Sequence, residues 1–160
     1  MLLAIDPGTT KSGWVVMDGY TPMGHGIHDN ETIIEAIHSG RWNITQAVIE
    51  KISYQGMNVG QTTFDTCEWV GRFHEALVMK GIKPFYVKRR DVQINLCGTV
   101  KAGDTNVKGA LVARFAPDDG PHGKGTKSKP GWFHGFASHK WQAYAAGVTG
   151  LDMMRRGDQL

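Results

Sequence analysis

Two acidic side chains interrupt runs of apolar residues. Asp6 directly follows the run Leu2–Ile5, and Glu50 lies inside the run Ala47–Ile52. An ionised carboxylate in an apolar strand costs free energy unless it is paired, protonated or bound to a metal. Each acid could simply reach water at the end of a strand. A divalent cation shared by both acids explains the two together, because Mg²⁺ favours one or two carboxylates with water and phosphate oxygens.

Basic residues concentrate in the other half of the chain. The formal net charge is +3, but residues 1–80 carry 5 basic and 9 acidic residues (net −4), and residues 81–160 carry 13 and 6 (net +7). This asymmetry predicts a C-terminal surface that binds an anionic partner. Phosphate contacts from such residues would supply sequence-independent affinity for nucleic acid. The candidate contacts are Lys88, Arg89, Arg90, Lys101, Lys108, Lys124, Lys127 and Lys129.

The elements that must position these residues follow from apolar periodicity. Short apolar runs predict strands over 2–5, 14–17, 47–52 and 84–87. Apolar spacings of three and four predict helices over 30–40, 62–80, 104–115 and 138–150. The N-caps of the first, third and fourth helices are expected to be Asn30, Asp104 and Ser138. Residues 118–131 combine Gly, Pro and Lys and predict a long loop. Together these elements predict an α/β domain with a mixed sheet.

Length and composition exclude several classes of protein. A chain of 160 residues with 41% hydrophobic residues fits one folded domain and not a disordered tail. Cys67 and Cys97 are far apart and form no CxxC pair, so we expect reduced intracellular thiols. No apolar run approaches the length of a membrane span, and we expect no signal peptide.

Several segments resemble one family in order along the chain. Residues 3–10 (LAIDPGTT) with Gly13 resemble the first strand and turn of the RuvC family of Holliday junction resolvases. Val48–Lys51 resembles that family's strand with the second catalytic carboxylate, and Ser138-His139 resembles the opening of its last helix. More closely, the chain resembles a phage-type subgroup of RuvC-like proteins, in which a Ser-His-x-Trp segment opens the last helix. Sugar kinases and actin-like ATPases share the first motif, but they need a second such domain.

The resemblance implies the fold and the activity. The fold would be RNase H-like (RuvC-type), with a mixed five-stranded sheet flanked by helices, a nuclease domain over 1–151 and a short C-terminal tail over 152–160. The activity would be metal-dependent hydrolysis of Holliday junctions or related branched DNA, such as forks, in recombination or repair. Two Mg²⁺ ions, or Mn²⁺, would bind at each active site, held by Asp6 and Glu50.

The last helix departs from the family pattern. The family places there an Asp, or a His followed three residues later by an Asp, whereas this chain has His139 and Gln142. An amide is a weaker Mg²⁺ ligand than a carboxylate. Cleavage could persist, with His139 as metal ligand or as the group that positions the attacking water. It could also be slow, or the chain could be a branched-DNA-binding protein with an inactive site. Asp104, Asp118 or Asp119 could substitute, although a capping role and solvated loop positions explain them more simply.

The remaining expectations concern partners. Tyr54 lies near the family position of an aromatic ring that enters the junction centre, one residue out of register, so it either stacks on bases or packs internally. Because a four-way junction needs two symmetric incisions, the resemblance implies a homodimer. The helix face around Trp69 and Phe73 is a candidate interface, although half of it could equally be ordinary core. We expect the cytoplasm of a bacterial or phage-infected cell. Surface or core roles are expected for His25, His28, His38, His74, His122 and His134.

Overall fold

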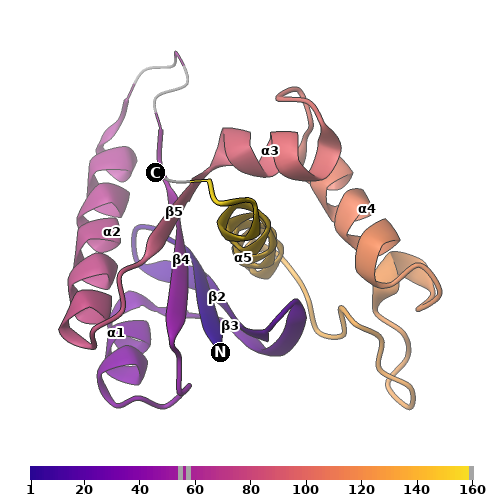
Figure 1. The fold of residues 1–160 in the computed structure, drawn as a ribbon, viewed down its shortest axis with the longest axis horizontal. Coiled ribbons are helices and arrows are strands. Elements are labelled where there is room, and N and C mark those ends of the chain that lie inside the picture. Colours follow the sequence, from indigo (N-terminus) through magenta and orange to yellow (C-terminus); the bar gives the residue numbers. More distant parts are fainter. Residues whose placement is uncertain (54–55, 57–58, 159–160) are drawn as a thin grey trace.

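The structure is a computed structural model that describes residues 1–53, 56 and 59–158. Five strands form one mixed sheet in the order β3-β2-β1-β4-β5 (Figure 1). β1 (Leu2–Asp6) pairs antiparallel with β2 (Lys11–Asp18), which pairs antiparallel with β3 (Thr21–Asp29). β4 (Gln46–Lys51) is parallel to β1, and β5 (Phe85–Lys88) is parallel to β4. The predicted mixed five-stranded α/β architecture is confirmed.

Helices cover both faces of the sheet (Figure 1). α1 (Asn30–His38) and α2 (Gln61–Met79) pack on one face, where Ile5 and Ile49 meet Phe73. α5 (His139–Arg156) packs on the other face, where Ala4 and Val48 lie in a second core. An outer arm beyond α5 consists of α3 (Arg89–Cys97), α4 (Asp104–Phe115) and the short helix η1 (Pro121–Gly123). Because side chains alternate along a strand, Asp6 and Glu50 share the α5 side with Ala4 and Val48.

Glycines allow α5 to lie close to the sheet. A Cβ added at Gly147 would lie 2.6 Å from Sδ of Met17, and one at Gly150 would lie 2.5 Å from Cγ2 of Val48. At the start of the helix, a Cβ on Gly13 would lie 2.4 Å from the carbonyl oxygen of His139. Gly13 is the strand partner of Asp6. The first turn of α5 is therefore seated directly beside the end of β1.

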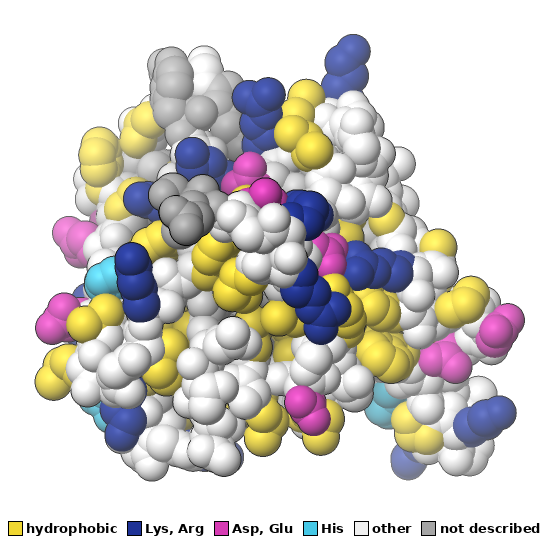
Figure 2. All heavy atoms as spheres, in the orientation of Figure 1, with side chains coloured by type: hydrophobic (Ala, Val, Ile, Leu, Met, Phe, Trp, Pro, Cys, Tyr) yellow, Lys and Arg dark blue, Asp and Glu magenta, His cyan; other side chains and the backbone are white. Residues whose placement is uncertain are grey.

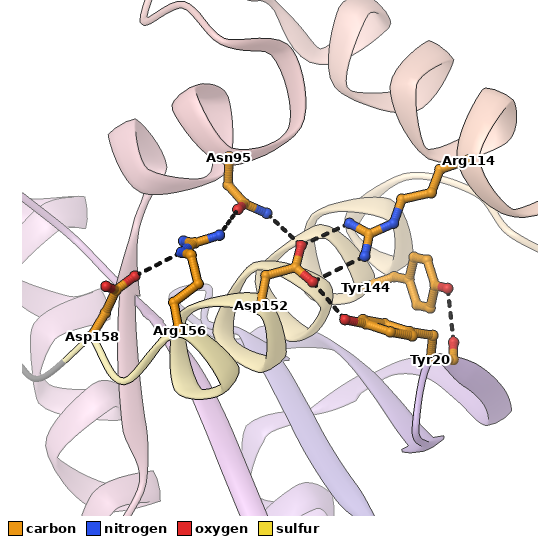
Figure 3. A network of polar contacts seen from close by, with 7 residues as sticks. All are labelled: Tyr20, Asn95, Arg114, Tyr144, Asp152, Arg156 and Asp158. Atoms are coloured by element: carbon orange, nitrogen blue, oxygen red, sulfur yellow. Dashed lines mark hydrogen bonds and ion pairs between the residues drawn. The ribbon is translucent and has the colours of Figure 1, made fainter.

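A polar network centred on Asp152 attaches the outer arm to α5 (Figure 3). Arg114 of α4 donates two hydrogen bonds to the Asp152 carboxylate, at 2.7 and 2.9 Å, and Asn95 of α3 and Tyr20 each donate another. Burial disfavours the charge of Asp152, but these hydrogen bonds outweigh burial and lower its pKa to about 2. Arg156 extends the network by donating to Asn95. One carboxylate thus links α3, α4 and the turn after β2 to the central helix.

Three elements were not predicted, namely β3, α3 and the short helix η1 inside the expected loop, and one helix is longer than expected. β3 carries Pro22, Gly24 and Gly26 at the edge of the sheet, and these residues interrupt the apolar and β-branched pattern that marks a strand. α3 is mostly polar and buries only Val92, so it shows no apolar period. α5 continues past residue 151 to Arg156, because Asp152 and Arg156 bond to the arm. Among the described residues, no helix is long and apolar enough to cross a membrane.

Candidate active site

Asp6 and Glu50 lie side by side at the carboxyl ends of the neighbouring interior strands β1 and β4. Asp6 ends β1, and the parallel pairing of Ile5 with Ile49 places Glu50 at the neighbouring position of β4. Burial and the charge of Asp6 raise the pKa of Glu50 to about 8. Burial also raises the pKa of Asp6, outweighing its hydrogen bond to His139. The predicted pair of carboxylates is therefore brought together in a setting that penalises two uncompensated negative charges.

Buried polar side chains hold the turn that follows Asp6. The Gly8 N–H donates to Oγ of Ser12 at 3.1 Å, and this hydroxyl donates to Oδ1 of Asn30 at 2.6 Å. Asn30 returns a hydrogen bond from Nδ2 to the Gly8 carbonyl at 3.0 Å. Ser12 and Asn30 are each 1% exposed. The prediction that Asn30 caps its helix is wrong: Asp29 precedes α1, and the Asn30 side chain serves the turn beside the site instead.

α5 contributes both residues predicted from its first turn. Nδ1 of His139 lies 2.9 Å from Oδ2 of Asp6, while its side chain remains 63% exposed. Gln142 lies one turn further along the helix. Its Oε1 is buried without a hydrogen-bond partner among the described residues, and so is Oε2 of Glu50. Ser138 is the N-cap of α5 as predicted, although it makes no capping hydrogen bond through its side chain.

These donors fit a hard divalent cation. Buried oxygens without a partner need an explanation, and a bound ion is one. Carboxylate and amide oxygens are ligands of Mg²⁺, which keeps several waters and substrate phosphate oxygens for the rest of its shell. In the part of the chain that the structure describes, no three His, Cys, Asp or Glu side chains form a metal-binding group. Asp6 and Glu50 would be the two carboxylate ligands, with Gln142 one turn after His139 on α5 and Nε2 of His139 as the imidazole nitrogen that does not face Asp6.

An ion pair that was not predicted borders the carboxylates. Arg89 is the first residue of α3, Asp104 is the first residue of α4, and the two side chains are hydrogen bonded. Arg89 lowers and Asp104 raises the pKa of both Asp6 and Glu50, so the pair lies within their electrostatic reach. The expected capping role of Asp104 is wrong, because Gly103 occupies the N-cap. No sequence signal connects two residues 15 positions apart on different helices.

The alternative acids in the loop have other surroundings. Asp118 is exposed. Asp119 is partly buried and accepts a hydrogen bond of 2.7 Å from the Trp132 N–H, so it holds the loop and is not merely solvated.

The remaining basic candidates border the outer arm. Lys108 and Lys124 help line a cavity of about 730 Å³ between α4 and η1, with Trp141 in its wall. Exposed positions are occupied by Lys88, Arg90, Lys101, Lys127 and Lys129. Figure 2 shows Lys and Arg side chains spread over this view of the molecule, including the ends of the arm. Tyr54 lies outside the described residues.

The predicted interface on α2 is partly wrong. Phe73 is 0% exposed because it packs in the core beneath the helix. Trp69 is partly buried, and the Arg72 guanidinium lies 4.2 Å from its ring centroid. Of the histidines expected to be structural, His28 accepts a hydrogen bond from the Trp14 indole, and His74 bonds to the Tyr86 hydroxyl.

Comparison with known proteins identifies the fold. No family model and no curated protein matches the sequence. The structure is similar to T. thermophilus RuvC in complex with a Holliday junction substrate, with a TM-score of 0.69 and 15% identity over 98% of this chain and 96% of that chain. A second Thermus thermophilus RuvC structure matches with a TM-score of 0.69, 16% identity and the same coverage. The chain therefore has the RuvC-type, RNase H-like fold that was predicted.

Proposed function

We propose that this protein is a metal-dependent endonuclease that cleaves Holliday junctions or related branched DNA by phosphodiester hydrolysis. The observation that carries the proposal is the position of Asp6 and Glu50 directly after the paired Ile5 and Ile49, with Oε2 of Glu50 buried and without a partner among the described residues. The similar RuvC structure in complex with a Holliday junction substrate supports the choice of DNA. Bound Mg²⁺ or Mn²⁺, two ions per site, would generate the water nucleophile and stabilise charge on the phosphate.

The chain's own residues would prepare this chemistry. The Gly8 turn holds the segment after Asp6, and the hydrogen bond from His139 orients the Asp6 carboxylate. Nε2 of His139 is left to hold or position a water, because Nδ1 faces Asp6. The basic side chains on the outer arm and loop would bind phosphates on either side of the cleaved bond.

Further properties belong to the same proposal. We infer a homodimer, because resolving a near two-fold junction needs two symmetric incisions. We also infer a phage-type member of the RuvC-like group that acts in recombination or repair, in the cytoplasm of a bacterial or phage-infected cell. The second candidate is a branched-DNA-binding protein with an inactive site. The neutral amide of Gln142 favours it, because the family has an acid at this position.

Nicking assays separate the two candidates. Purified protein with Mg²⁺ or Mn²⁺ should cut synthetic four-way or forked DNA and leave linear duplex intact. Asp6→Asn and Glu50→Gln should bind branched DNA without cutting it, whereas Glu68→Gln, an exposed acid on α2, should cut normally. Branched-DNA binding without nicking in either metal would support the inactive alternative. Absence of both would refute the proposed function.

A further inference from the structure

The Arg89 guanidinium is held by one contact and keeps free donors. Its side chain is only 22% exposed, and Nη2 donates to Oδ1 of Asp104. Among the described residues, the guanidinium has no other hydrogen-bond partner. The Arg89 nitrogens that lack a hydrogen-bond partner are not buried, so their N–H groups remain accessible. A guanidinium carries five N–H donors, so one edge is available to a ligand.

The position of this edge indicates the ligand. β5 carries Val87 as the strand partner of Glu50, and Arg89 follows two residues later, at the same end of the sheet. Arg89 stabilises the charged forms of both Asp6 and Glu50, which places its positive charge beside them. A phosphate bound over these carboxylates would therefore lie close to the guanidinium. Two parallel N–H groups match the geometry of two phosphate oxygens.

We propose that Arg89 is a catalytic residue that contacts the scissile phosphate, and that Asp104 is a positioning residue that holds the guanidinium beside Asp6 and Glu50. The inference rests on the proposed nuclease function. Asp104 occupies one N–H of Nη2 and fixes the plane of the group. The free edge then donates to the phosphate oxygens, where negative charge increases during hydrolysis.

The two residues should act in opposite directions on cation binding. Arg89 places a positive charge beside the carboxylates, and Asp104 places a negative one there. Removing the Arg89 charge should tighten Mn²⁺ binding to the DNA-free protein, and removing the Asp104 charge should weaken it. If the pair only supported the structure, removing either charge would change the Mn²⁺ affinity in the same direction.

The test uses Arg89→Gln, Arg89→Lys, Asp104→Asn and the double variant, with Arg41→Gln as an exposed control for charge loss on a distant turn. Arg89→Gln should lower kcat on four-way DNA about 100-fold or more, the order seen when one transition-state donor is removed. Its KM should change far less. Arg89→Lys should recover only part of the rate, since it keeps the charge and loses the planar pair of parallel N–H groups. Arg41→Gln should cut normally.

Asp104→Asn should lower kcat about 10-fold, and it should have little further effect when Arg89 is already Gln, because positioning requires the group positioned. Calorimetric titration with Mn²⁺ then measures the opposite shifts. If wild-type protein cuts branched DNA and Arg89→Gln cuts equally fast, the inference is wrong and the proposed function stands. Additive losses in the double variant would overturn the positioning role. A wild-type protein that cuts no branched DNA in either metal would instead overturn the nuclease function, and the catalytic role with it.

Discussion

Nδ1 of His139 lies 2.9 Å from Oδ2 of Asp6, so the first residue of α5 is joined to the last residue of β1. Partners of this kind orient a ligating carboxylate, and their loss costs about 10- to 100-fold in metal affinity. His139→Ala should therefore weaken Mn²⁺ binding by this order, measured by calorimetry, and slow the cleavage of branched DNA. His38→Ala, an exposed histidine on α1, is the matched control. Unchanged Mn²⁺ affinity in His139→Ala would show that the contact does not serve a cation.

Gln142→Glu places a carboxylate at the α5 position whose amide oxygen, like Oε2 of Glu50, is buried without a partner among the described residues. We expect tighter Mg²⁺ binding, about 10-fold, because affinity for hard cations rises with the number of charged oxygen ligands. Without metal the same change should lower the melting temperature, since it adds a third buried acid. Titration with Mg²⁺ and melting in chelator measure the two effects. Equal Mg²⁺ affinity would place Gln142 outside the cation site.

Glu50 should make the metal-free protein less stable at high pH. Its pKa rises from 4.5 in the unfolded chain to about 8 in the fold, because of burial and the charge of Asp6. The folded state therefore keeps a proton that the unfolded chain has lost, and the free energy of unfolding declines as pH rises from 4.5 to about 8. Glu50→Gln should remove most of this decline. Melting temperatures in chelator between pH 5 and 9 provide the measurement, and parallel curves would contradict the assignment.

Gly13→Ala should separate activity from stability. The new Cβ would lie 2.4 Å from the His139 carbonyl, a backbone atom that cannot rotate away. Overpacking of this kind costs about 1–3 kcal/mol, measured by urea unfolding. The rate of DNA cleavage should fall by more than the loss of folded protein explains, because the displaced residue, His139, is the hydrogen-bond partner of Asp6. Gly71→Ala, at an exposed position of α2 where nothing lies within 4 Å of the added Cβ, is the control.

Asp152 should stabilise the outer arm at all but very acid pH. Its pKa is lowered to about 2, since the hydrogen bonds led by that of Arg114 outweigh burial. The stabilising contribution is therefore complete above the ordinary value of 3.8 and is lost as pH falls through about 2. Asp152→Asn should cost about 1.5–3 kcal/mol at neutral pH, the range for hydrogen bonds to charged groups. Urea unfolding at pH 7 and pH 2.5 should show a smaller difference at the lower pH, and an equal difference would contradict this role.

The sequence predicted that Asp6 and Glu50 would come together because charge stands out in an apolar strand. Asp6 and Glu50 break hydrophobic runs, and the motif around His139 opens a clear helix. The charged residues that border these carboxylates do not interrupt an apolar run. Arg89 and Asp104 are ordinary charges at helix starts, and only the packing of α3 against α4 brings them together. Asp152 lies in a segment that was expected to be a tail. Its hydrogen-bond donors come from positions 20, 95 and 114, so no local pattern in the sequence indicates its role.

The buried turn after Asp6 has a consequence for how such a chain can diverge. Ser12 and Asn30 each satisfy the other, so replacing one leaves a buried polar atom stranded. The two positions must therefore change together in evolution, whereas most exposed positions of the sheet and helices can drift singly. A chain under this constraint can lose nearly all contiguous similarity to its relatives and still inherit the same turn.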